Sequence, residues 1–77
     1  MIKKSEVLIH ECSKHGNISW KNMTKCISGS ILEGTLPYTI GHLEQALSLM
    51  PLSTHSKNLK VGGARINYLV TLLDGLV

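Results

Sequence analysis

The 77 residues of this chain are enough for one domain, which we expect to span residues 1–77. Hydrophobic residues make up 43 % and charged residues 17 % of the sequence, a balance that excludes a disordered chain. No run approaches the ~18 apolar residues of a membrane span, and we expect no secretory signal. The net charge of +3 suits a nucleic acid or an acidic protein as partner. These features predict a cytoplasmic protein without a membrane segment.

The first expected helix runs from about Ser5 to His15. Ser5 suits the N-cap, because its hydroxyl can accept a hydrogen bond from an early backbone N–H. Cys12 falls on the apolar face of this helix. Gly16-Asn17 should end it, since both residues tolerate left-handed dihedral angles.

A second helix is expected to begin at Ser19. Apolar residues recur at helical spacing along it: Trp20, Met23, Ile27 and Ile31. Gly29 weakens its end by up to about 1 kcal/mol relative to alanine. We therefore expect the helix to break at Gly29 and to restart briefly before Gly34.

The third helix has the clearest pattern. Its apolar seam consists of Ile40, Leu43, Leu47 and Met50. Pro37 suits a first-turn position, where the missing N–H is not needed. Pro51 should end the helix.

The C-terminal segment allows two interpretations. A helix beginning near Gly63 fits the spacing of its leucines, whereas a β-hairpin over residues 59–70 fits a two-residue turn at Gly62-Gly63. In either case the segment is too apolar for a free surface. It forms either half of a homodimer interface or part of the core, through Ile66, Leu69, Val70, Leu73, Leu76 and Val77.

The side chains that could carry chemistry are few. Cys12 and Cys26 are expected to be reduced, buried thiols, with a disulfide or a metal role as the alternatives. In the metal role, Cys12, His15 and Cys26 would bind zinc with His10 or His42 as the fourth ligand, but the paired spacing of structural zinc ligands is missing. Glu11 and His15 lie four residues apart, yet no nucleophile is placed beside them. We therefore predict no metal, no cofactor and no enzymatic activity.

The stretch from Gly34 to Leu43, Gly-Thr-Leu-Pro-Tyr-Thr-Ile-Gly-His-Leu, resembles the turn and recognition helix of helix-turn-helix DNA-binding proteins. Glycine stands at the turn, Ile40 follows six positions later and Leu43 three positions after that. Thr39 also occupies a place where threonine is common in these proteins. The resemblance covers about residues 26–47.

The resemblance implies a small all-α domain of three or four helices, of helix-turn-helix type. Its alternative is a winged helix, whose wing would be the C-terminal hairpin around Gly62-Gly63. The implied contacts to bases and backbone come from Thr35, Tyr38, Thr39, His42 and Gln45. The implied contacts to flanking phosphates come from Lys57, Lys60 and Arg65.

The sequence thus leads to two functional hypotheses. The first is a small DNA-binding protein, a transcriptional regulator that uses its helix-turn-helix. The second is a small helical module that binds another protein as an inhibitor, adaptor or assembly subunit. A homodimer is compatible with both.

Overall fold

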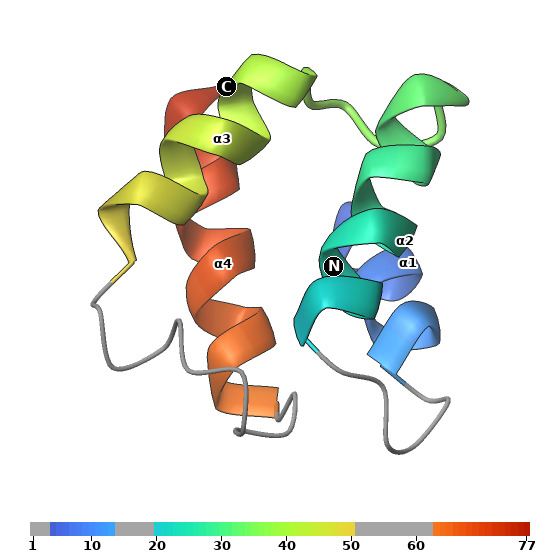
Figure 1. Ribbon diagram of the computed structural model, residues 1–77, viewed down its shortest axis with the longest axis horizontal. Helices are drawn as coiled ribbons and strands as arrows, with labels where there is room; N and C mark the ends of the chain where they lie inside the picture. Colours follow the sequence, from blue (N-terminus) through green and yellow to red (C-terminus); the bar gives the residue numbers. More distant parts are fainter. Residues whose placement is uncertain (1–3, 14–19, 51–62) are drawn as a thin grey trace.

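The computed structural model describes residues 4–13, 20–50 and 63–77, which form four α-helices and contain no strand. The helices are α1 (Lys4–Ser13), α2 (Trp20–Leu32), α3 (Ile40–Leu49) and α4 (Gly63–Leu76) (Figure 1). The predicted all-α fold is confirmed. None of the helices in this described part combines the length and the apolarity needed to cross a membrane.

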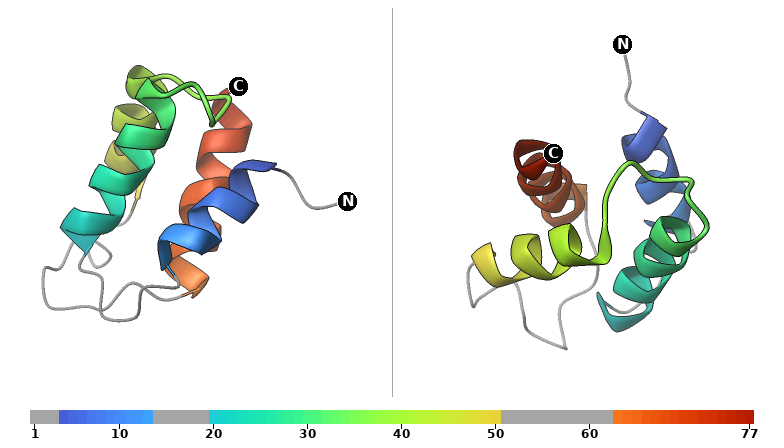
Figure 2. Two further views of the ribbon diagram at one scale, coloured as in Figure 1. Left: turned by 90° about the vertical axis from the view of Figure 1, so that its right-hand side faces the viewer. Right: turned by 90° about the horizontal axis from the view of Figure 1, so that it is seen from above.

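The helices form a closed ring of contacts. Each packs against the next helix along the chain, and α4 packs against α1. Seen from above, α1 lies beside α2 and α3 lies beside α4, with the connection from α2 to α3 passing over one end (Figure 2). The apolar sides of all four helices therefore face a common centre.

That centre is built mainly from aliphatic residues and methionine. The buried set comprises Ile9, Cys12, Met23, Ile27, Ile31, Leu36, Tyr38, Leu43, Ala46, Met50, Ile66, Leu69, Val70 and Leu73. Trp20 packs partly buried against its edge. Because α4 supplies four of these residues, it is the central wall of the core.

Two details of the first two helices differ from the prediction. Ser5 is not the N-cap of α1, because the helix begins at Lys4 and Ser5 lies inside its first turn. Helix α2 does not break at Gly29 but continues to Leu32. The packing of α2, which buries Ile27 and Ile31 on either side of Gly29, outweighs the low helix propensity of glycine. A Cβ atom at Gly29 would meet nothing within 4 Å, so no close contact requires glycine at this position.

The glycine expected at the turn, Gly34, adopts the positive φ that such a turn requires. Gly34 has φ +80°, in the left-handed region. Its N–H donates to the carbonyl of Ile31 at 3.0 Å, and the N–H of Thr35 donates to the carbonyl of Ser30 at 3.0 Å. This pair of bonds is a Schellman motif, which satisfies the last carbonyls of α2 and turns the chain away.

Thr39 begins α3. Its hydroxyl accepts a hydrogen bond from the backbone N–H of His42 at 3.0 Å, and the Nδ1 of His42 accepts one from the N–H of Thr39 at 3.0 Å. This reciprocal capping box fixes the start of the helix at Ile40. The prediction that Pro37 stands in the first turn of the helix is therefore wrong, because Pro37 lies before the cap.

The C-terminal segment is a helix. Residues 64–70, which a hairpin would place in its second strand, belong to α4, so the hairpin and the winged-helix alternative are wrong there. Residues 59–62 lie outside the described residues. The spacing of Ile66, Leu69, Val70 and Leu73 decides the outcome, because it brings all four onto the buried side of a helix.

Candidate functional site

Tyr38, expected at a DNA surface, is a core residue. It is only 5 % exposed, and its hydroxyl donates a hydrogen bond to the Oδ1 of Asp74 on α4. Burial and this bond raise the pKa of Tyr38 to about 12, while a hydrogen bond with the buried Ser5 acts in the opposite direction. Tyr38 thus ties the α2–α3 connection to α4 and α1, and it is not available to contact bases.

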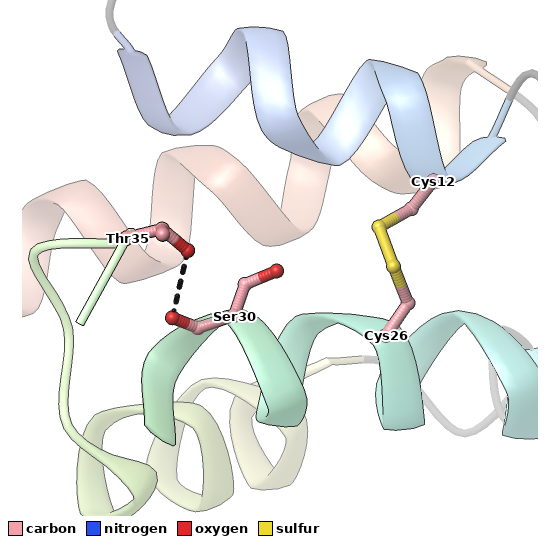
Figure 3. The surroundings of a disulfide bond; sticks show 4 residues. All are labelled: Cys12, Cys26, Ser30 and Thr35. Atoms are coloured by element: carbon pink, nitrogen blue, oxygen red, sulfur yellow. Dashed lines mark hydrogen bonds between the residues drawn. A yellow bond between two sulfur atoms is a disulfide. The ribbon is translucent and has the colours of Figure 1, made fainter. Parts of the chain in front are cut away.

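The other residues expected to contact DNA at the turn and in α3 have local structural roles or lie open to solvent. Thr39 and His42 cap α3 through each other. The hydroxyl of Thr35 donates to the carbonyl of Ser30 at 2.9 Å, which reinforces the end of α2 (Figure 3). Gln45 is exposed. Of this group only Gln45 has a side chain for which the structure shows no local bond.

Arg65, expected at a phosphate, points into the protein instead. It is 8 % exposed, and its guanidinium carbon lies 4.8 Å from the centre of the Trp20 ring. A guanidinium over an indole face is attracted by the negative face of the ring, so this contact links the start of α4 to the start of α2. The two lysines predicted beside it, Lys57 and Lys60, lie outside the described residues.

The residues proposed for a homodimer interface separate into two groups. Ile66, Leu69, Val70 and Leu73 belong to the core of the single chain, so the alternative of core packing holds for them. Two residues at the end of the chain remain partly accessible: Leu76 is half-buried and Val77 is exposed. An interface centred on the first four residues is therefore incompatible with the folded monomer.

The two cysteines are bonded to each other. Cys12 of α1 and Cys26 of α2 form a disulfide with a Cα–Cα distance of 6.3 Å (Figure 3). The prediction of reduced, buried thiols is wrong, because the disulfide alternative holds and Cys26 is exposed. Neither sulfur is available to bind zinc. Within the described residues, no group of three or more His, Cys, Asp or Glu side chains could hold a metal ion. The cytoplasmic location stays a prediction.

The outer face of α4 is the feature that the sequence analysis missed. The exposed residues described on this helix are Asn67, Tyr68, Thr71 and Gly75. With half-buried Leu72 they form what we call the α4 face. An open hollow of about 390 Å³ has Asn67, Tyr68, Thr71 and Leu72 along its walls.

The α4 face differs from the other helix surfaces in charge. Exposed charged residues occur on α1 (Lys4 and Glu11), on α2 (Lys21 and Lys25) and on α3 (Glu44). The exposed residues described on α4 include none. The two charged residues of this helix turn toward aromatic partners elsewhere in the fold, one to Trp20 and one to Tyr38.

A signal for this face was present in the sequence. Only Arg65 and Asp74 are charged between residues 63 and 77. If both side chains make contacts inside the fold, the outer surface of this helix carries no charge. No family model matches the chain, and no curated protein or solved structure matches it either. The candidate site therefore rests on the geometry and chemistry of its own residues.

Proposed function

We propose that this chain is a non-catalytic protein-binding domain and that its docking surface is the α4 face. The observation that carries the proposal is the absence of charge from the exposed residues described on α4. Charged groups are costly to remove from water, and the centres of protein interfaces are accordingly depleted in them. An uncharged helix face with an accessible tyrosine has the composition of such a centre.

Tyr68 is the natural anchor of this surface. It is 45 % exposed, so its ring offers both apolar area and a hydroxyl to a partner. Tyrosine is enriched among residues that dominate binding energy, because it supplies a large contact area with few rotatable bonds. The hollow beside it gives a partner side chain a place to enter.

The face is held on a rigid support. Leu69 and Leu73, on the opposite side of the same helix, are 0 % exposed. A surface whose backbone is fixed by the core loses little conformational entropy when a partner binds. The 14 residues of α4 correspond to about 21 Å of helix, a length suited to a partner helix packed along it.

The experiment uses a charge placed in the middle of the face. Thr71→Glu introduces a carboxylate there, and Ser48→Glu introduces the same group on α3. The two sites are matched, because both residues are exposed and both hydroxyls donate to a backbone carbonyl one turn earlier, Thr71 to Asn67 at 2.9 Å and Ser48 to Gln45 at 2.6 Å.

The wild-type chain and both variants are immobilised and exposed to an extract of the source cells, and the affinity of each retained protein is then measured with purified components. We expect Thr71→Glu to weaken binding by about tenfold or more, equivalent to 1.4 kcal/mol. Ser48→Glu should change the affinity less than about twofold, because its site lies off the face. Equal binding by all three chains, or the retention of no protein, would contradict the proposal.

DNA binding with a role in transcription is a second candidate function. The specific observation in its favour is the positive φ of Gly34 followed by the capping of α3 by Thr39, as the helix-turn-helix resemblance requires. Against it, seven residues, 33–39, separate α2 from α3, whereas the motif uses a turn of three to four. Titration of a labelled duplex at about 50 and 200 mM salt separates the two functions. Affinity for DNA should fall steeply over that range, because bound counterions are released.

A further inference from the structure

The disulfide joins α1, which together with α3 is one of the two shortest helices described, to α2. Cys12 lies in the last turn of α1, and Cys26 lies in the middle of α2 (Figure 3). Helix α1 has 10 residues, which is shorter than the ~12–15 residues below which isolated helices are marginal in water. It therefore depends on its docking to remain helical.

Apart from the disulfide, apolar packing attaches α1 to its neighbouring helices. Ile9 is its one fully buried aliphatic residue, and Leu8 packs partly buried at the edge of the core. Ser5 adds the hydrogen bond with Tyr38. Helix α2, by comparison, buries Met23, Ile27 and Ile31. The contacts of α1 are mainly with α2 and α4.

We propose that the Cys12–Cys26 disulfide is a redox lock, whose reduction releases α1 and uncovers the apolar sides of α2 and α4 that α1 covers. The inference goes beyond the proposed function and does not depend on it. The bond closes a loop across 14 residues of sequence. Loop closure of this length favours the docked state by about a hundredfold.

The two cysteines of the disulfide differ in their exposure to solvent. Cys26 belongs to the exposed residues, while Cys12 is 8 % exposed. The thiolate of an external thiol reductant attacks the Sγ of Cys26, forms a mixed disulfide there and expels Cys12 as a thiolate, which takes a proton from water. A second thiolate of the reductant then attacks the reductant-derived sulfur of the mixed disulfide. The reductant leaves oxidised as a disulfide, and Cys26 leaves as a thiolate that is protonated.

Hydrogen exchange read by mass spectrometry tests the lock on the full chain. The oxidised protein and the protein treated with a dithiol reductant are compared helix by helix. We expect the amides of α1 to exchange about a hundredfold faster after reduction, as the loop-closure effect requires. The amides of α3 should keep their protection within about twofold, because their contacts with α4 and α2 persist.

Several results would overturn the proposal. Unchanged protection of α1 after reduction would show that non-covalent contacts suffice to hold it. Equal loss of protection in α1 and α3 would show that the bond supports the whole fold and that no helix is released separately. A double variant, Cys12→Ala with Cys26→Ala, should show fast exchange in α1 with and without reductant, and a response of this variant to the reductant would also contradict the lock.

The route of attack has its own readout. A monothiol at limiting concentration, followed by acid quenching and peptide mass analysis, traps the mixed disulfide. We expect the adduct on Cys26. An adduct found mainly on Cys12 would overturn the assignment of Cys26 as the point of entry.

Discussion

Replacing Tyr38 by phenylalanine removes the hydroxyl that joins the α2–α3 connection to α4 and leaves the size of the ring almost unchanged. The lost bond ends on the carboxylate of Asp74. A hydrogen bond to a charged group contributes about 1.5–3 kcal/mol, so we expect Tyr38→Phe to lower the free energy of unfolding by that amount at pH 8.

The same hydroxyl makes the stability of the protein depend on alkaline pH. Its pKa is about 12 in the folded chain, against the ordinary value of 10.0 that applies after unfolding. Because the folded state holds this proton more tightly, the stabilisation is complete below pH 10 and is lost as the pH rises toward 12. By pH 11 the free energy of unfolding falls by about 1.4 kcal/mol through this group alone.

Urea unfolding followed by circular dichroism at pH 8 and pH 11 measures both effects. Tyr68→Phe is the matched control, because it removes an exposed tyrosine of α4 and leaves Tyr38 in place. The wild-type chain and Tyr68→Phe should lose about 1.4 kcal/mol more between the two pH values than Tyr38→Phe does. The same pH dependence in all three chains would refute the reasoning.

The remaining predictions concern local conformation and packing, and equilibrium unfolding measures each. Gly34→Ala should lower the free energy of unfolding by about 1–2 kcal/mol, because alanine disfavours the left-handed region. Gly29→Ala, within α2, should raise the free energy of unfolding by about 0.5–1 kcal/mol. Two changes of the same sign would contradict this account of the turn. Leu69→Ala should cost about 2–5 kcal/mol by leaving a cavity, and Leu32→Ala, at a site 77 % exposed, should cost less than about 0.5 kcal/mol. Similar losses for the two leucine variants would mean that the core is misplaced.

Local signals predicted much of the fold. The sequence predicts Gly34 as the turn residue because glycine adopts positive φ at no steric cost, and the structure confirms this conformation. The apolar seam from Ile40 to Met50 predicted α3, whose helix ends one residue before Met50. The competing hairpin could not be excluded locally, because Gly62-Gly63 is a strong turn signal. The burial of a full helical stripe in α4 decided between them.

The site depended on contacts between distant parts of the chain, which periodicity does not contain. Tyr38 finds its partner 36 residues away, and this contact turned an expected surface residue into a core residue. Arg65 is buried for the same reason, because Trp20 lies across the fold. Both cysteines were rightly placed on helices, but their pairing depends on how α1 docks onto α2.

The most direct test of the proposed protein-binding function is site-specific photo-cross-linking within the source cells. A benzoylphenylalanine at position 68 replaces the exposed tyrosine of the α4 face, and one at position 45 replaces Gln45, an exposed residue of α3. The proposal predicts a discrete cross-linked protein from position 68 and none from position 45. Cross-linking from position 45 alone, or from neither position, would contradict it.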